Sequence, residues 1–183
     1  STGKTTITGG HFTDNLAGDS TNNQWGSGVI HVKGGTTNIG GTGANPVVIS
    51  GNTATGEGGA IYLESGEMYL SHTDLKDNKA TTYGGAIYQI GGNLVVTSGT
   101  EISGNSAGNK GGAFYQESGT AQILSGTITN NRAPVGGGIA QTATPTQNRA
   151  IANCSVFDGV KLYENVSTVS NTGNDVYSAY EGT

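Results

Sequence analysis

The stretch that decides the fold is Gly58-Gly59-Ala60-Ile61-Tyr62, because the same five-residue pattern returns three more times along the chain. The later copies are Gly84-Gly85-Ala86-Ile87-Tyr88, Gly111-Gly112-Ala113-Phe114-Tyr115 and the weaker Gly136-Gly137-Gly138-Ile139-Ala140. The fourth residues of the copies, from Ile61 to Ile139, follow one another at steps of 26, 27 and 25 residues. A fixed period of this size is typical of a solenoid.

A second motif precedes each copy and keeps phase with it: an apolar residue, two polar or glycine positions, Asn, any residue, and Ala. The asparagines of this motif are Asn15, Asn52, Asn78, Asn105, Asn131 and Asn165, the last with Ser167 in place of Ala. Asparagine tolerates left-handed backbone and bonds its own neighbouring backbone, so it suits a tight corner. Stacked amides also satisfy one another when they are buried. We therefore expect these residues at the corners between coils, bonded to each other as a structural ladder.

The composition indicates many short strands joined by turns. The 183 residues include 33 Gly and 3 Pro, and only 11% are charged. Apolar residues come in short runs between Gly, Ser, Thr and Asn clusters, and no window carries a helical apolar stripe. Since each strand is too short to be stable alone, pairing with its equivalent one period on is the economical arrangement. The sequence predicts an all-β fold, a single-stranded right-handed parallel β-helix (solenoid) of about seven coils.

Departures from the regular period predict insertions, and because the sequence shows no initiator Met, signal peptide or anchor, we expect a segment of a larger protein. Extra residues lie near 17–28, 35–46 and 141–153, and we expect them to project as loops from one β-helix segment spanning residues 1–183. The net charge of −5, with its 8 basic residues scattered singly, gives no footprint for nucleic acid. No apolar run is long enough to cross a membrane, so we expect no membrane insertion of this segment.

Strand alternation suggests a candidate binding surface. If Ile61 and its equivalents point inward, then Tyr62, Tyr88 and Tyr115 point outward, with His31 ahead of them. This exposed aromatic column would suit sugar rings or aromatic partners, and Trp25, in a polar insertion, is a further ligand-binding candidate. The same column also has a structural interpretation, because stacked tyrosines stabilise neighbouring strands by cross-strand contact.

The acidic residues do not form a convincing catalytic set. Polysaccharide lyases need clustered carboxylates, often around calcium, with an Arg or Lys, and glycoside hydrolases need close carboxylates. The residues preceding the ladder asparagines alternate between acids and other types, and Asp74, Lys76 and Asp77 form one local charged cluster. The three histidines lack ligand spacing. We therefore expect no catalytic residues, no metal and no cofactor; a polysaccharide-active enzyme, or its carbohydrate-binding remnant, is the alternative.

The paired motifs Gly-Gly-Ala-Ile and Phe-x-x-Asn resemble those of the chlamydial polymorphic membrane proteins and of similar bacterial surface repeat proteins. Phe12 to Asn15, Gly58 to Ile61 and Gly84 to Ile87 match in full, and Gly111 to Phe114 nearly. Later copies of the second motif have aliphatic residues in place of Phe: Ile49, Leu75, Ile102, Ile128 and Leu162. The resemblance covers most of the chain.

The resemblance implies a right-handed parallel β-helix that serves as a bacterial adhesin or autotransporter-like passenger. We therefore expect a non-catalytic, extracellular module at the bacterial cell surface, anchored by parts not in this chain. Its expected partners are a host surface protein or glycan and flanking β-helix coils of the same protein, with no nucleic acid among them.

Overall fold

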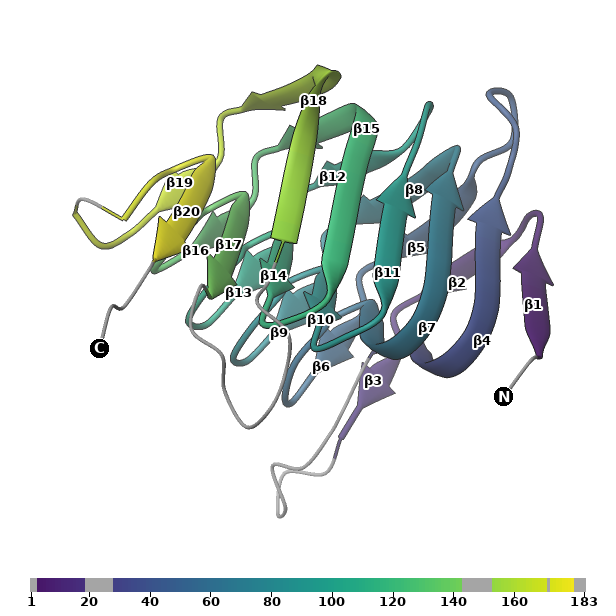
Figure 1. Ribbon diagram of the computed structural model, residues 1–183. Coiled ribbons are helices and arrows are strands. Elements are labelled where there is room, and N and C mark those ends of the chain that lie inside the picture. The colour runs from purple at the N-terminus through teal and green to yellow at the C-terminus, as the bar shows by residue number, and fades with distance from the viewer. Residues whose placement is uncertain (1–2, 19–27, 143–152, 171, 180–183) are drawn as a thin grey trace.

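The computed structural model describes residues 3–18, 28–142, 153–170 and 172–179, and all the regular elements in them are β-strands. They form one sheet of 14 strands and one of 6 strands. All the pairings between these strands are parallel. Equivalent positions lie opposite one another: Ile87 pairs with Ile61 on one side and with Phe114 on the other. The predicted parallel β-helix is confirmed, and its coils lie side by side along Figure 1.

The 14-stranded sheet falls into columns of stacked strands. The column that carries the Gly-Gly motif contains the first residues of β4 (Ile30–Gly40) and β7 (Ile61–Ser71), then β10 (Ile87–Gln89), β14 (Phe114–Gln116), β17 (Ile139–Thr142) and β20 (Val176–Ala179). The next column contains β1 (Lys4–Ile7), the later residues of β4 and β7, β11 (Asn93–Val96), the first part of β15 (Thr120–Thr129) and β18 (Asn153–Tyr163).

A third column and the small sheet complete each coil. The third column contains β2 (His11–Thr13), β5 (Val47–Ser50), β8 (Thr73–Lys76), β12 (Glu101–Ser103) and the ends of β15 and β18. The 6-stranded sheet contains β3 (Leu16–Ala17), β6 (Thr53–Ala54), β9 (Lys79–Ala80), β13 (Ser106–Ala107), β16 (Arg132–Ala133) and β19 (Val166–Ser167). The ladder asparagines lie in the short corner between these two columns.

Alternation along the strands builds the core. In β7, Ile61, Leu63, Met68 and Leu70 are fully buried, and Leu75 of β8 completes the same layer. Most residues with the same register above and below are also apolar, the exceptions being Gln89 opposite Leu63 and Thr37 opposite Met68, so each coil covers the interior of the next. Because burial of such a side chain is worth roughly 1.5–3 kcal/mol, the stacking of layers is the main source of stability.

The asparagine ladder is confirmed, and its hydrogen bonds are complete. The Nδ2 of each asparagine donates to the Oδ1 of the asparagine in the next coil, at 2.8 to 3.0 Å from Asn15 through to Asn165. The same Oδ1 also accepts the backbone N–H of the preceding asparagine. The second Nδ2 hydrogen goes to a backbone carbonyl of the preceding coil, for example from Asn105 to Leu75. Asn52, Asn78, Asn105 and Asn131 are fully buried.

The backbone at the ladder corner differs from the expectation in one respect. The left-handed residue is the one before each asparagine, with φ between 54° and 68°. The residues in this conformation are Asp14, Gly51, Asp77, Gly104, Asn130 and Glu164. The asparagine itself does not occupy that conformation because its amide must point along the axis of the solenoid. A Cβ at Gly104 would lie 2.2 Å from Oδ1 of Asp77, which explains why acids and glycines alternate in this column.

The two glycines of the Gly-Gly motif have different roles. Gly84 has φ of 63°, and a Cβ there would lie 2.1 Å from the carbonyl oxygen of Ile87. Gly85 has no such φ, but a Cβ there would lie 2.1 Å from the carbonyl oxygen of Gly112 in the next coil. The first glycine therefore permits the turn and the second permits the close approach of coils. The alanine that follows, Ala86, is fully buried.

Of the three predicted insertions, only the one at 35–46 lies wholly within the described residues. Residues 19–27 and 143–152, which hold most of the insertions predicted near 17–28 and 141–153, lie outside the described residues. The loop predicted at 35–46 is too wide, because β4 continues to Gly40 and pairs with β7. Gly40 lies opposite Ser71 and Val47 opposite Thr73, so only residues 41–46 are added, where the next coil has His72. The right-handed winding and the count of about seven coils stay predictions.

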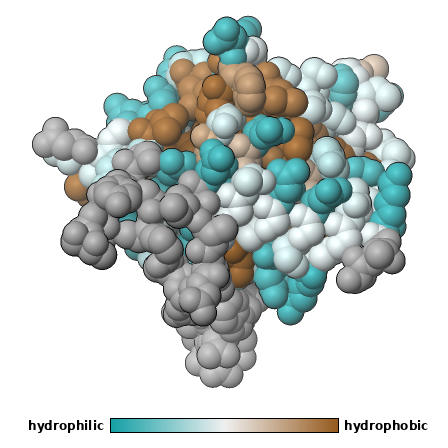
Figure 2. All heavy atoms as spheres, viewed as in Figure 1, coloured by the Kyte–Doolittle hydropathy of each residue, from teal (hydrophilic) through white to brown (hydrophobic). Residues whose placement is uncertain are grey.

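Apolar side chains are exposed toward the C-terminal end of the solenoid. Leu124 of β15 and Val156 and Phe157 of β18 are 38%, 42% and 47% exposed. Figure 2 shows hydrophobic residues gathered in the upper part of the view, where β15 and β18 lie in Figure 1. At the same end of the solenoid the ladder finishes with Asn165, whose Nδ2 donates to Oδ1 of Asp175 at 2.8 Å.

Replacing a ladder asparagine by alanine tests this account of the fold. We expect Asn78→Ala and Asn105→Ala each to lower the free energy of unfolding by about 1–3 kcal/mol, because each leaves buried amide and carbonyl groups without partners. Chemical denaturation measures the loss. Asn109→Ala is the matched control, since Asn109 is exposed and outside the ladder; an equal loss in that variant would contradict the role of the ladder.

Candidate functional site

The tyrosine column exists in the predicted register, but it is not exposed. Tyr62 lies opposite Tyr88, which lies opposite Tyr115. Their exposed fractions are only 1%, 6% and 5%. Together with Ile90 and Ala140 they form a second hydrophobic cluster outside the main core. The prediction of a surface aromatic column is therefore wrong.

Alternation identified the correct face of the strand, but another segment covers that face. Tyr83, in the link between β9 and β10, stacks on Tyr115 with ring centroids 4.8 Å apart and on Tyr88 at 6.2 Å. Tyr88 and Tyr115 stack on each other at 5.8 Å and 8°. Such geometries are favourable for aromatic pairs. The structural interpretation of the column, a stabilising stack, is the one that fits its burial.

The hydroxyl groups of Tyr88 and Tyr115 form hydrogen bonds with a carboxylate and with another hydroxyl. The Tyr88 hydroxyl donates to Oε2 of Glu117. Burial, and then this hydrogen bond to a carboxylate, raise the pKa of Tyr88 far above its ordinary value. Burial likewise raises the pKa of Tyr115, whose hydroxyl bonds that of Thr142. Both phenols are therefore neutral donors or acceptors and not nucleophiles.

Of the remaining two ligand-binding candidates, His31 and Trp25, only His31 lies among the described residues. His31 extends the column, with its ring 4.7 Å from that of Tyr62, and its Nε2 lies 2.9 Å from Oε2 of Glu64. Lys33 lies 3.7 Å from the same carboxylate oxygen. Trp25 lies outside the described residues. The structure thus joins His31 to the tyrosines, at a polar, half-exposed end of the buried cluster.

Two glutamines end the strands that carry the tyrosines. Gln89 and Gln116 are fully buried and lie opposite each other. The Nε2 of Gln89 donates to the carbonyl oxygens of Gly91, Gly92 and Thr120, at 2.9 to 3.2 Å. These glutamines therefore brace the corner between the first two columns through their Nε2 groups, whereas the Oε1 atoms of both are buried without a hydrogen-bond partner.

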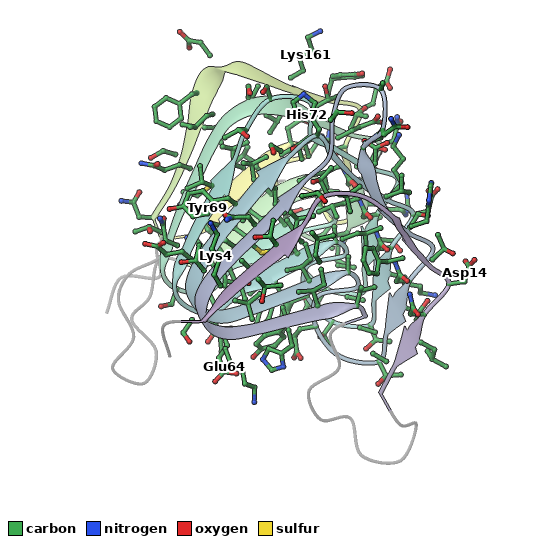
Figure 3. The ribbon with its side chains drawn as sticks, turned by 90° about the vertical axis from the view of Figure 1, so that its right-hand side faces the viewer. Lys4, Asp14, Glu64, Tyr69, His72 and Lys161 are labelled. Atoms are coloured by element: carbon green, nitrogen blue, oxygen red, sulfur yellow. The ribbon has the colours of Figure 1, made fainter. Side chains whose placement is uncertain are left out.

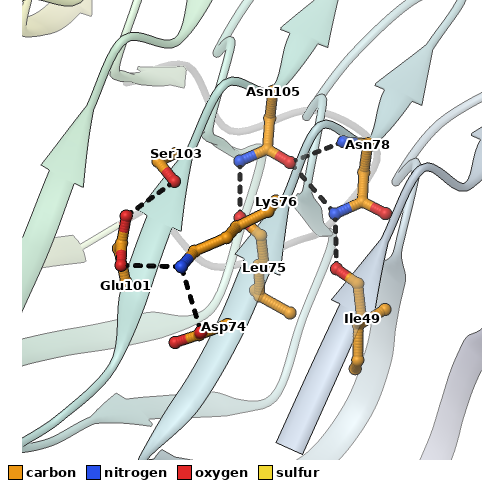
Figure 4. Close-up of polar contacts among 8 residues, drawn as sticks. All are labelled: Ile49, Asp74, Leu75, Lys76, Asn78, Glu101, Ser103 and Asn105. Atoms are coloured by element: carbon orange, nitrogen blue, oxygen red, sulfur yellow. Dashed lines mark hydrogen bonds and ion pairs between the residues drawn. The ribbon is translucent and has the colours of Figure 1, made fainter. Parts of the chain in front are cut away.

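The charged cluster around Lys76 is real, but its members differ from those predicted. Nζ of Lys76 lies 3.0 Å from a carboxylate oxygen of Asp74 and 2.9 Å from one of Glu101, in the neighbouring coil. Ser103 donates to Glu101 at 2.9 Å. Figure 4 shows this network beside the asparagine ladder. Asp77, expected in the cluster, instead lies at the left-handed corner over Gly104.

The ion pairs shift the pKa values of their members in opposite directions. Burial alone would lower the pKa of Lys76, but hydrogen bonds to Glu101 and Asp74 outweigh it and raise the value. Burial alone would raise the pKa of Glu101, but the hydrogen bonds from Lys76 and Ser103 lower it. Both groups are therefore charged at neutral pH.

The cluster forms one wall of a groove of about 480 Å³ on the outer face of the solenoid. Asp74 and Glu101 lie at one end and Lys161 and Tyr163 at the other. The groove is lined further by Gly99, Thr100, Gly126, Thr127 and Gly159. The groove was not predicted from the sequence. Its residues come from successive coils, so they are neighbours in space although they are separated along the chain.

Comparison with known proteins bears on the repeat itself. Residues 46–64, 73–89 and 99–117 match the family model of the Chlamydia polymorphic membrane protein repeat. Each match joins an asparagine corner to the following Gly-Gly strand or its equivalent, so the resemblance drawn from the motifs is confirmed. No curated protein and no solved structure matches the chain.

Within the described part of the chain, no group of three or more His, Cys, Asp or Glu residues could hold a metal ion.

Across the described ranges, no helix has the length and apolar character that a transmembrane span requires.

Truncating a buried tyrosine should affect stability and not ligand contact. We expect Tyr115→Ala to lower the free energy of unfolding by about 3–5 kcal/mol, as for other large aromatic truncations in a core. Tyr69→Ala is the matched control, because Tyr69 is 37% exposed, and it should change stability by less than about 0.5 kcal/mol. Thermal and chemical unfolding of both variants make the comparison; equal effects would show that the column is not a second core.

The Lys76–Glu101 pair predicts a specific pH dependence. The lowered pKa of Glu101 gives a stabilisation that is present above its ordinary value of 4.5 and is lost as the pH falls through the lower folded-state pKa. The raised pKa of Lys76 gives a second stabilisation, which is present below the ordinary value of 10.5 and is lost as the pH rises through the folded-state pKa of Lys76. The difference in Tm between the native protein and Glu101→Gln should be largest between about pH 5 and pH 10. A constant difference down to about pH 2 would contradict the pairing.

Proposed function

We propose that this chain is a non-catalytic β-helical module of a bacterial cell-surface adhesin or autotransporter-like passenger, which presents a binding surface to a host protein or glycan. The observation that carries the proposal is the match of three successive repeats to the Chlamydia polymorphic membrane protein repeat. That family is named for membrane proteins of a bacterium, which supports an extracellular location at the cell surface, anchored by parts not in this chain.

The fold supports a display role through its rigidity. The corner amides from Asn52 to Asn131 are buried and bonded along the axis, and the tyrosine cluster adds a second packed layer outside the main core. A scaffold of this kind holds surface side chains of successive coils at fixed spacing of about 4.8 Å. Fixed spacing reduces the entropy that must be lost when a surface binds its ligand.

The ends of the solenoid support stacking with flanking β-helix coils of the same protein. Phe12 and Val176 occupy repeat positions whose equivalents, Ile49 and Ile139, are buried in the neighbouring coils, yet Phe12 is only partly buried and Val176 is 48% exposed. A further coil on either end would cover such side chains and pair the strand edges, which are otherwise liable to aggregate.

The alternative function, a polysaccharide-active enzyme, would depend on Asp74 and Glu101, which lie opposite each other in neighbouring coils. A glycoside hydrolase needs a carboxyl group whose pKa is raised so that it can protonate the leaving group. The pKa of Glu101 is lowered by its hydrogen bond to Lys76, so this carboxyl is unsuited to act as the acid. The electrostatics of this pair therefore favour a non-catalytic surface.

An adhesion assay combined with a depolymerisation assay tests the proposal. Beads coated with the native chain should adhere to cultured epithelial cells above beads coated with albumin, and should release no reducing ends from polygalacturonate. Asp74→Asn and Glu101→Gln should likewise show no turnover. Turnover that disappears in the Glu101→Gln variant would establish the enzyme in place of the adhesin, and adhesion no greater than that of albumin would contradict the display role.

A further inference from the structure

The groove beside the Lys76 cluster has a regular construction. Asp74 lies opposite Glu101, Glu101 opposite Thr127, and Thr127 opposite Lys161. One polar side chain is thus contributed by each of four successive strands, β8, β12, β15 and β18. At about 4.8 Å per strand the row is about 14 Å long. An extended ligand lying along the axis would meet one polar group at each step.

Three glycines place backbone along the groove, each packed closely on a neighbouring residue. Gly99, Gly126 and Gly159 carry no side chains, and they lie among the lining residues of the same groove. Thr100, beside them, is 3% exposed, and its hydroxyl has no hydrogen-bond partner. Buried hydroxyls are normally paired. This hydroxyl oxygen is itself buried, so it lies beneath the floor of the groove and is not a group that a ligand contacts directly.

The charges of the groove are balanced. Lys76 is hydrogen-bonded to both Asp74 and Glu101, which fixes the two carboxylates while leaving them able to accept further hydrogen bonds. Lys161, which is exposed, lies at the opposite end of the row. Two acids and two bases cancel, so the groove does not suit a polyanion such as nucleic acid or a sulfated chain.

An aromatic surface is present at the end that carries Lys161. Tyr163 lines the groove and is 45% exposed, in contrast to the buried tyrosine column. Figure 3, viewed along the solenoid, places Lys161 at the top of the cross-section and Glu64 at the bottom, so this groove is remote from the polar end of the tyrosine cluster. The groove is therefore a separate surface.

We infer that this groove binds a neutral oligosaccharide along the solenoid axis. Sugar hydroxyls would donate to the carboxylates of Asp74 and Glu101, another would accept from Lys161, and one ring would lie against the face of Tyr163. The volume lies within the range of about 300–1,000 Å³ that is usual for ligand sites. This inference deepens the proposed display function and rests on it, since it names the ligand class and the face that takes it.

Titration of the native chain with defined sugars tests the inference. The probes are cellotriose, maltotriose and chitotriose as neutral trisaccharides, and a heparin-derived tetrasaccharide as the anionic comparison. At least one neutral trisaccharide should bind, and its addition should shift the NMR amide signals of Gly126 and Gly159. Glu101→Gln and Tyr163→Ala should each weaken that binding about tenfold, because a charge-assisted hydrogen bond and a ring contact are lost.

Two matched variants distinguish a groove effect from a general one. Glu67→Gln and Tyr69→Ala alter an acid and an exposed tyrosine of β7 outside the groove, and both should retain native affinity. Unfolding curves for all four variants establish that each is folded before titration.

The outcomes separate this inference from the display function. Neutral binding that survives both groove variants would overturn the inference and leave the display function standing. Binding of the heparin tetrasaccharide alone, or of no probe, would also overturn the inference. The display function is tested independently by the adhesion of coated beads to cells. Neutral binding lost in both groove variants and kept in both controls supports the inference.

Discussion

The hydrogen bond from the side-chain amide of one ladder asparagine to that of the next is the interaction on which the structure depends. It occurs once per coil, always at the same corner, and both hydrogens and both lone pairs of each buried amide are used. An unpaired amide in the interior would cost more than most single contacts gain. The ladder therefore fixes the register of the coils, because a shift of one residue would leave a whole column of amides unsatisfied.

The other repeated residues follow from that constraint. With the amides aligned, the residue before each asparagine must be left-handed, which restricts it to Asp, Asn, Glu or Gly in this chain. The Gly-Gly pair then permits the tight turn and the close approach of neighbouring coils, and the strand that follows carries one side chain into the main core and the next into the tyrosine cluster. Buried side chains thus lie on both sides of this strand, which limits the surface available for binding to other columns. The outer face of β8, β12, β15 and β18 combines free volume with varied polar chemistry.

Much of this arrangement could be predicted from the sequence, because a strict repeat turns sequence spacing into spatial neighbours. The ladder, the parallel pairing and the inward positions of Ile61, Ile87 and Phe114 all follow from the period. The burial of the tyrosines could not be predicted in the same way. Alternation within a strand identifies a face, but it does not indicate that a linking segment, here the one containing Tyr83, packs over that face.

The groove could not be predicted from the sequence for a different reason. Its polar row lies four positions before the ladder asparagines, at Asp74, Glu101, Thr127 and Lys161, and aligning the coils on those asparagines would have brought the row together. The residues differ in type from coil to coil, so no motif marks them. The concavity is formed by residues of several coils, and it becomes visible only when the coils are stacked.

A double-mutant cycle on the ladder tests the central claim most directly. If neighbouring asparagines are bonded along the axis, then the effects of Asn78→Ala and Asn105→Ala on the free energy of unfolding should be non-additive by about 0.5–3 kcal/mol. The pair Asn52→Ala and Asn131→Ala, separated by two intervening rungs, should be additive within about 0.5 kcal/mol. Additivity in both cycles would contradict the account, because it would mean that the asparagines stabilise their own corners independently and do not form a ladder.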